Sequence, residues 1–340
     1  MSQIARNYLR SWHLNSFFSL SLSFSDVMHE FPNIDFSQIS TYSIFERTSL
    51  VQVNACASPW KKGGDFSAFL ASLPEILAGK DFHRVVKKVV AAHHKERPVV
   101  MAFGAHVIKC GLSPILIDLM ERGIVSAIAL NGAGIIHDFE LAYMGHTSED
   151  VAAAISSGEF GMGRETGYIL NEAITQGGKE GWGIGESVGR AIIASSPQFV
   201  KYSLTAAAVR LGIPVTVHVA IGTDIIHIHP NANGAAIGEG SHRDFKRFTG
   251  VVSQLEGGVY FNIGSAVLLP EVFLKAVSVA RNLGYQLQHF TTVNMDFIRQ
   301  YRPTQNVVCR PTADGGEGFS LIGHHELLLP LLAAAIIEQV

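Results

Sequence analysis

The sequence predicts an α/β fold built on a doubly wound, mostly parallel sheet. Two observations support this prediction. Short apolar runs typical of buried strands alternate with segments that carry helix-capping residues and helical spacing, and hydrophobic residues make up 47% of the 340 residues while charged residues make up only 16%. An ordinary soluble domain has about 25% charged residues. Near-continuous apolar strands are typical of parallel sheets that helices cover on both faces.

The first strand–helix–strand unit is expected just before the middle of the chain. The apolar run at residues 98–103 is typical of a buried strand. Residues 113–123 are predicted to be a helix, because a Ser-Pro start precedes apolar residues at helical spacing and a glycine follows them. A second strand is expected at residues 124–130, directly before an Asn-Gly-Ala-Gly turn at residues 131–134.

The same alternation continues to the end of the chain. We expect further strands at residues 213–220, 258–263 and 286–293, and further helices at residues 196–212, 270–284 and 326–338. The glycine-rich segment 177–185 is predicted to be a mobile loop. Because the sequence shows neither a repeat nor a linker after residue 40, residues 41–340 are expected to form one domain.

Residues 1–40 are expected to be a leader that could be disordered. Two arginines, Arg6 and Arg10, precede the serine-interrupted apolar stretch 17–24, a pattern that resembles a secretory signal. No small-residue cleavage site follows it, so a strand or a disordered leader is the alternative. No uninterrupted apolar run reaches the roughly 18 residues of a membrane span, so no membrane partner is expected.

Charge and cysteine usage limit the classes of function. The 26 Lys and Arg residues against 29 Asp and Glu residues give a net charge of −3, which argues against nucleic acid as a partner. The cysteines Cys56, Cys110 and Cys309 are too widely spaced for a disulfide framework, so a reducing cytoplasm is expected. The shortage of charge also predicts subunit interfaces, and therefore a homo-oligomer.

In open parallel sheets, ligands bind beyond the carboxyl ends of the strands. That rule selects four predicted loops, at residues 104–111, 131–138, 221–234 and 264–268. The Asn-Gly-Ala-Gly turn in the second loop has bare amides that could hold a phosphate, although a tight turn without a ligand is the alternative. The Gly-x-Gly-x-Gly pattern at residues 181–185 has no strand before it, which weakens a nucleotide-binding interpretation.

Histidines gather in these loops. His106 and His137 are candidates for proton transfer beside a bound ligand, with a structural hydrogen bond as the alternative for His137. His227 and His229 would share one face of an extended segment close to Asp224, a spacing that could bind a metal. Exposed or hydrogen-bonded histidines are the alternative.

Lys109, Cys110 and residues 324–326 are further candidates for a reactive or structural role. Lys109 could form an imine with a carbonyl compound, or bind an anion. Cys110 has no evident histidine–acid partner along the sequence, so a buried small residue is the expectation. The His-His-Glu run at residues 324–326 begins the last predicted helix, where a capping or interface role is expected.

The segment from Arg97 to Asp150 resembles the deoxyhypusine synthase family. The residues that carry the resemblance are the loop at 103–111 and the turn at 131–139, and the similarity continues more weakly at residues 213–224, Gly264 and residues 328–332. The resemblance implies a Rossmann-like fold, a homotetramer and NAD as the cofactor. It also implies a transferase that oxidises a polyamine and passes its aminobutyl group through a lysine imine.

The resemblance and the strand-end loops together give a candidate site. The expected NAD-binding residues are Gly104, Ala105, His106, Asn131, Gly132, Ala133, Gly134, Asp224 and Gly264, and the expected catalytic residues are His137, His106 and Lys109.

The sequence also departs from the family. Two glutamates that the family has before Asp138 are replaced by Ile136 and His137, and its paired histidines are replaced near residues 270–271. Residues 309–316 stand where the family has its catalytic lysine. We therefore expect an NAD-dependent enzyme that acts on a small amine or related metabolite and does not make deoxyhypusine. The alternatives are a nucleotide-binding relative without catalysis and a hydrolase with a histidine-bound metal.

Overall fold

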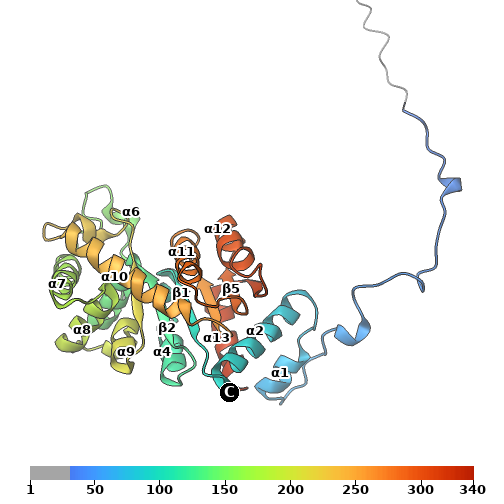
Figure 1. Cartoon of the computed structure of the whole chain (residues 1–340), viewed down its shortest axis with the longest axis horizontal. Helices are drawn as coiled ribbons and strands as arrows, with labels where there is room; N and C mark the ends of the chain where they lie inside the picture. Colours follow the sequence, from blue (N-terminus) through green and yellow to red (C-terminus); the bar gives the residue numbers. More distant parts are fainter. Residues whose placement is uncertain (1–30) are drawn as a thin grey trace, which may run out of the picture. The chain divides into compact units, whose positions relative to one another are not determined.

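The computed structural model describes residues 31–340 (Figure 1). Contacts divide the chain into two units, residues 1–50 and residues 51–340. The described part of the first unit contains the short 3₁₀ turn η2, Phe36–Gln38. The signal-like stretch 17–24 lies outside the described residues, and the expected domain boundary at residue 40 stays a prediction.

Residues 51–340 contain a six-stranded sheet in which every strand pair is parallel, so the predicted α/β fold is confirmed. The strand order is β3-β2-β1-β4-β5-β6. In this order the chain reverses its direction of winding between β1 and β4, and ligands bind at such a switch point. The strands are β1 (Val99–Phe103), β2 (Ala127–Asn131), β3 (Val215–His218), β4 (Val259–Ile263), β5 (Thr291–Asp296) and β6 (Glu317–Ile322).

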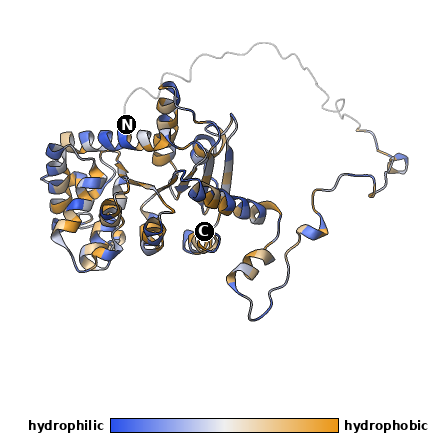
Figure 2. Cartoon of the chain, turned by 60° about the horizontal axis from the view of Figure 1, so that its bottom comes forward, coloured by the Kyte–Doolittle hydropathy of each residue, from blue (hydrophilic) through white to orange (hydrophobic). Residues whose placement is uncertain are grey.

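Helices cover both faces of the sheet (Figure 1). In Figure 2 the helices around the sheet carry both hydrophobic and hydrophilic residues, as helices with one buried face do. The helices on one face are α2 (Leu77–His94), α4 (Ser113–Glu121), α5 (Gly132–Met144), α9 (Leu204–Leu211) and α13 (His325–Ile337), and those on the other are α10 (Gly234–Ser253) and α11 (Leu268–Asn282). The remaining α-helices are α1 (Phe66–Ser72), α3 (His106–Lys109), α6 (Val151–Ala154), α7 (Arg164–Glu180), α8 (Ile184–Ser195) and α12 (Tyr301–Pro303).

The two cores follow from the alternation of side chains along each strand. On β1, Met101 and Phe103 belong to the core under α2, α4 and α5, whereas Val100 and Ala102 belong to the core under α10 and α11. All four side chains are buried, which explains why β1 appears in the sequence as a continuous apolar run.

Some predicted elements were wrong in their bounds. The strand expected at residues 286–293 begins five residues later and ends at Asp296, and β6 was not predicted. The helix expected from residue 196 begins only at Leu204, because Ser203 caps it by accepting a hydrogen bond from the Ala206 amide. A strand is hard to recognise in β6 because its pattern is broken by Gly318 and only Phe319 and Leu321 are buried.

The glycine-rich segment 177–185 is not a loop. Gly177 lies inside α7, Gly181 ends that helix at a φ of +80°, and Gly183 precedes α8. A Cβ at Gly177 would lie 1.7 Å from the hydroxyl oxygen of Ser187. The glycine therefore allows α7 and α8 to pack closely, which is a different use of glycine from chain mobility.

No helix within residues 31–340 is both long enough and apolar enough to span a membrane.

Candidate functional site

The backbones after β1 and β4 meet at the switch point. The amide of Gly104 donates a hydrogen bond to the carbonyl of Ile263 at 3.0 Å. A Cβ on Gly104 would lie only 2.6 Å from the carbonyl oxygen of Gly264. The structure thus brings two of the predicted cofactor-binding residues together and leaves both without a side chain, so a ligand could approach this backbone closely.

The Asn131 side chain ties the ends of β1 and β2 together. Its Oδ1 accepts hydrogen bonds from the amide of Ala105 at 3.1 Å and from the amide of Gly134 at 3.2 Å. Asn131 is therefore the N-cap of α5, which begins directly at Gly132 rather than after a loop.

The side chain of Asp224 packs against the same turn, beside Gly132. A Cβ on Gly132 would lie 1.9 Å from its Oδ2, and the backbone amide of Ala133 lowers the pKa of its carboxyl against the effect of burial. With Asn131 bound to Gly134, one amide of this turn is occupied within the protein. The interpretation of the turn as a set of bare, phosphate-binding amides stays a prediction for its other amides.

A donor and an acceptor face one another beside this turn. The Nδ1 atom of His227 accepts hydrogen bonds from the amides of Gly222 at 3.1 Å and Asp224 at 3.3 Å, so the proton of the neutral ring is on Nε2. That Nε2 lies 3.9 Å from Oδ2 of Asp224, too far for a hydrogen bond. Neither atom has a partner within residues 31–340, although both side chains are at least 95% buried.

This gap has the chemistry of a hydroxyl site. One hydroxyl group could accept a hydrogen bond from Nε2 of His227 and donate one to Oδ2 of Asp224. Burial raises the pKa of Asp224, and the neighbouring His227 opposes that shift.

The structure does not place His227 and His229 as the metal-site hypothesis requires. The segment before His229 is not extended but forms the 3₁₀ turn η5, Ile225–Ile228. Nε2 of His229 lies 2.9 Å from the carbonyl oxygen of Gly161, away from His227. Within residues 31–340 no three His, Cys, Asp or Glu side chains are arranged to hold a metal ion.

His137 lies in a second polar network, on α5. Its Nδ1 is 2.7 Å from the hydroxyl of Thr147, which donates a hydrogen bond to the carboxylate of Glu140. A cavity of about 410 Å³ borders Glu140 and Thr147. Burial lowers the pKa of His137, Glu140 opposes that shift, and Lys109 at the end of α3 reinforces it. His137 is therefore a neutral imidazole at pH 7, able to accept a proton.

Asp138, the acid of the family-like turn, has a structural role. Its buried carboxylate accepts hydrogen bonds from the Ser203 hydroxyl, from the amides of Leu204 and Thr205, and from the Thr205 hydroxyl, at 2.6–3.1 Å. These groups begin α9, so Asp138 holds the start of α9 against α5.

Beyond β1, β5 and β6 the structure brings together residues that the sequence analysis named separately, His106, Cys110 and the run 324–326, and adds Asp296. Sγ of Cys110 is 3.3 Å from Nε2 of His106 and 3.7 Å from Oε2 of Glu326. The rings of His106 and His325 are 6.0 Å apart, and Asp296 ends β5 nearby. The rule that ligands bind at strand ends would have selected His325 and Asp296 if β6 and the true end of β5 had been recognised.

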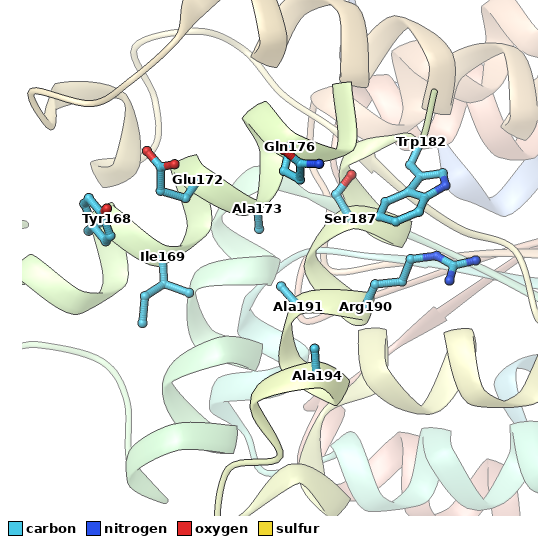
Figure 3. Close-up of a pocket in the computed structure, with 10 residues that line it drawn as sticks. All are labelled: Tyr168, Ile169, Glu172, Ala173, Gln176, Trp182, Ser187, Arg190, Ala191 and Ala194. Carbon is cyan, nitrogen blue, oxygen red and sulfur yellow. The ribbon is translucent and has the colours of Figure 1, made fainter. Parts of the chain in front are cut away.

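A separate cavity of about 580 Å³ lies between α7 and α8 (Figure 3). The guanidinium of Arg190 stacks on the Trp182 ring at 4.5 Å, and the small side chains of Ala173 and Ala191 line the floor. None of the predicted site residues lines this cavity, so it is not part of the strand-end site.

Comparisons with known proteins support the fold. No family model matches the sequence, and no curated protein matches it. Unliganded AgrE is 17% identical with a TM-score of 0.51 over 77% of this chain, and its complex with ornithine and NAD⁺ is 18% identical with a TM-score of 0.49 over 77%. The chain spans about a third of the length of AgrE, 33% in both structures.

Two other solved structures give lower scores. A putative LOR/SDH protein from Methanococcus maripaludis S2 is 16% identical with a TM-score of 0.47, over 78% of this chain and 71% of that one. A putative deoxyhypusine synthase from Entamoeba histolytica is 13% identical with a TM-score of 0.46, over 83% of this chain and 96% of that one. At such identities the similarity to solved structures, with AgrE above a TM-score of 0.5, shows that this chain has a Rossmann-like α/β fold.

Proposed function

We propose that this protein is an NAD-dependent enzyme of the deoxyhypusine-synthase-like type that acts on a small amine or a related metabolite. The observation that carries the proposal is the contact of Gly104 with Gly264 at the switch point, with buried polar atoms that lack partners on either side of it. AgrE, which has been crystallised with ornithine and NAD⁺, shares the fold, and this supports an amine as the substrate.

The residues at the strand ends fit NAD in part. The gap between Asp224 and His227 suits a ribose hydroxyl, and the side-chain-free backbone at Gly104 and Gly264 suits a flat group that lies close to it. At the start of α5, Asn131 accepts a hydrogen bond from the Gly134 amide and the Asp224 carboxylate lies against Gly132, so the phosphates would be held elsewhere. Bound NAD would supply the acceptor for a hydride.

His106, His137 and Lys109 are the proposed groups for proton transfer and amine capture. His106 lies at the end of β1 beside the switch point, whereas His137 is linked through Thr147 to Glu140. Lys109 ends α3 and is exposed, so its amine can reach a solvent-borne carbonyl compound.

The structure supports a reaction other than deoxyhypusine synthesis. A polyamine is a multiple cation and needs carboxylates, yet Ile136 is buried in the apolar core at the place of one family glutamate. In the segment that stands where the family has its catalytic lysine, Arg310 donates a hydrogen bond to Asn306 at 2.7 Å. A guanidinium stays protonated and is a poor nucleophile. We therefore propose a smaller amine, a homotetrameric assembly and a cytoplasmic location.

Calorimetric titration with NAD⁺ and NADH tests the cofactor. We expect saturable binding to the wild-type protein and a loss of about 10- to 100-fold in affinity for Asp224→Asn, because a hydrogen bond to a charged group contributes about 1.5–3 kcal/mol. Asp118→Asn is the matched control, since Asp118 lies on the α4 surface in an ion pair with Arg122. Absence of binding to the wild type at millimolar ligand would show that the cofactor assignment is wrong.

A further inference from the structure

His325 is a buried imidazole without hydrogen bonds. Only 2% of the residue is exposed, and neither Nδ1 nor Nε2 has a partner within residues 31–340. A buried polar group without a partner costs free energy, so native proteins rarely keep one unless a ligand or a reaction uses it. His325 is also the first residue of α13, whose other buried residues are all apolar.

The ring points to the switch point. Its Nε2 would lie 2.7 Å from a Cβ on Gly264. The carbonyl oxygen of Gly264 in turn would lie 2.6 Å from a Cβ on Gly104. The ring of His106 is 6.0 Å away, with an edge-on geometry. The unpartnered nitrogen therefore faces the same place that the strand order and the two glycines mark as a ligand site.

The charged and titratable groups around His325 come from several elements. They are Asp296 at the end of β5, His106 and Cys110 after β1, and His324 and Glu326 beside it in the chain. Burial lowers the pKa of His325, while Asp296 and Glu326 oppose that shift. His325 is thus neutral at pH 7, and the two carboxylates stabilise the ring when it gains a proton.

Cys110 is not the reactive group of this cluster. Burial and the Glu326 carboxylate raise the pKa of its thiol, whereas a nucleophilic cysteine needs a lowered pKa. Its contacts with His106 and Glu326 instead hold these side chains in place beside His325.

We propose that His325 is the catalytic base that removes the ammonium proton of a small cationic amine at the switch point, an inference that rests on the proposed NAD-dependent function. The substrate carries a hydrogen on the carbon that bears nitrogen. The N–H proton passes to Nε2 of His325, the C–H bond breaks with its electron pair going to NAD⁺, and a C=N bond forms. One ammonium ion and one NAD⁺ give one iminium ion, one NADH and one proton.

The surrounding carboxylates define the substrate class. Asp296 is 97% buried and Glu326 is exposed, so one carboxylate lies inside the site and one at its rim. A cation would gain from both, whereas a carboxylic acid without an amine would be repelled. The same reasoning favours ornithine-like amines over neutral alcohols.

The test compares His325→Gln with His289→Gln. His289 is an exposed histidine just before the start of β5, where it pairs with Glu256, whereas the proposed site lies beyond the carboxyl ends of the strands. Both variants and the wild type are titrated with NAD⁺ by calorimetry and assayed for NADH formation with ornithine and a panel of small primary amines. We expect unchanged NAD⁺ affinity in all three proteins and a rate lower by about 10²- to 10⁴-fold in His325→Gln alone.

A second readout needs no turnover. Histidine ring signals are followed by NMR in ¹⁵N-histidine-labelled protein without cofactor, and the His325 signal is identified as the one missing in His325→Gln. Ornithine or another amine of the panel should shift that signal, and glutarate at the same ionic strength should not. If no amine shifts it, or if His325→Gln retains the wild-type rate, the assignment is wrong. If the wild type does not bind NAD⁺, the proposed function fails instead.

Discussion

The carboxylate of Asp224 occupies the space beside Gly132 where any other residue would place its Cβ. A Cβ at this position would lie 1.9 Å from Oδ2 of Asp224, and the side chain of Asp224 is 95% buried. The two residues are 92 positions apart in the sequence and join the ends of β2 and β3. The need for glycine at position 132 therefore comes from the Asp224 side chain and does not require a bound ligand.

This contact predicts a coupled effect of two substitutions. Gly132→Ala should lower the free energy of unfolding by about 1–3 kcal/mol, because the new methyl group overlaps the Asp224 carboxylate. Combining it with Asp224→Ala removes the overlap, so the double variant should be more stable than the sum of the two single effects by about 0.5–3 kcal/mol. Urea unfolding of the four proteins measures the coupling, and strict additivity would contradict the contact.

Asp244 predicts a pH dependence of stability. This α10 residue is fully buried and accepts hydrogen bonds from the amides of Gly185 at 3.0 Å and Val217 at 2.8 Å. Burial raises its pKa from 3.8 to about 7, against the opposing effect of those hydrogen bonds. Because the folded state holds the proton more tightly, its contribution to stability is present below about pH 4 and falls as the pH rises to about 7.

The contribution of Asp244 is measured by comparing the pH dependence of the free energy of unfolding in the wild type and in Asp244→Asn. One such group changes the free energy of unfolding by at most about 1.4 kcal/mol per pH unit. Asp244→Asn should flatten the stability–pH curve between about pH 4 and 7, whereas Asp118→Asn, an exposed carboxylate paired with Arg122, should leave its slope unchanged. Parallel curves for the wild type and Asp244→Asn would show that Asp244 does not titrate in this range.

The composition predicts assembly. Only 16% of the 340 residues are charged, which is low for a surface that is fully solvated, and the resemblance to a tetrameric family agrees with this. We expect a homotetramer at micromolar concentration by light scattering. A monomeric mass at that concentration would contradict both arguments.

Lys109 should be the site of any imine chemistry. Lys275, the lysine nearest to the carboxyl terminus of the chain, is paired with Glu271 on the surface of α11. Incubation with spermidine and NAD⁺, followed by borohydride and peptide mapping, should give no adduct on Lys275 and no transfer to an acceptor protein. An adduct on Lys109 that disappears in Lys109→Arg would support a relocated nucleophile, and one on Lys275 would falsify this prediction.

The sequence by itself determined the fold class and selected candidate residues for the site. Strands buried on both faces, such as β1, must be apolar at every position, and this local requirement is visible without a structure. The Asn-Gly-Ala-Gly segment after β2 was recognised as the end of a strand, but the predicted loop at residues 131–138 is the start of α5, with Asn131 as its N-cap. The strand-end rule then selected Gly104 and Gly264, which the structure places side by side.

Only the tertiary structure decided what these residues do. The space beside Gly132 is filled by Asp224, which follows another strand, and the role of Asp138 depends on the start of α9, 65 positions away. From the sequence, His325 was expected to have only a capping or interface role for the same reason, since the absence of a partner within residues 31–340 and the approach of its ring to Gly264 are visible only in the structure. Hydrogen bonds and burial are properties of the packed chain, so a local pattern of residues cannot show which polar groups are satisfied and which remain for a ligand.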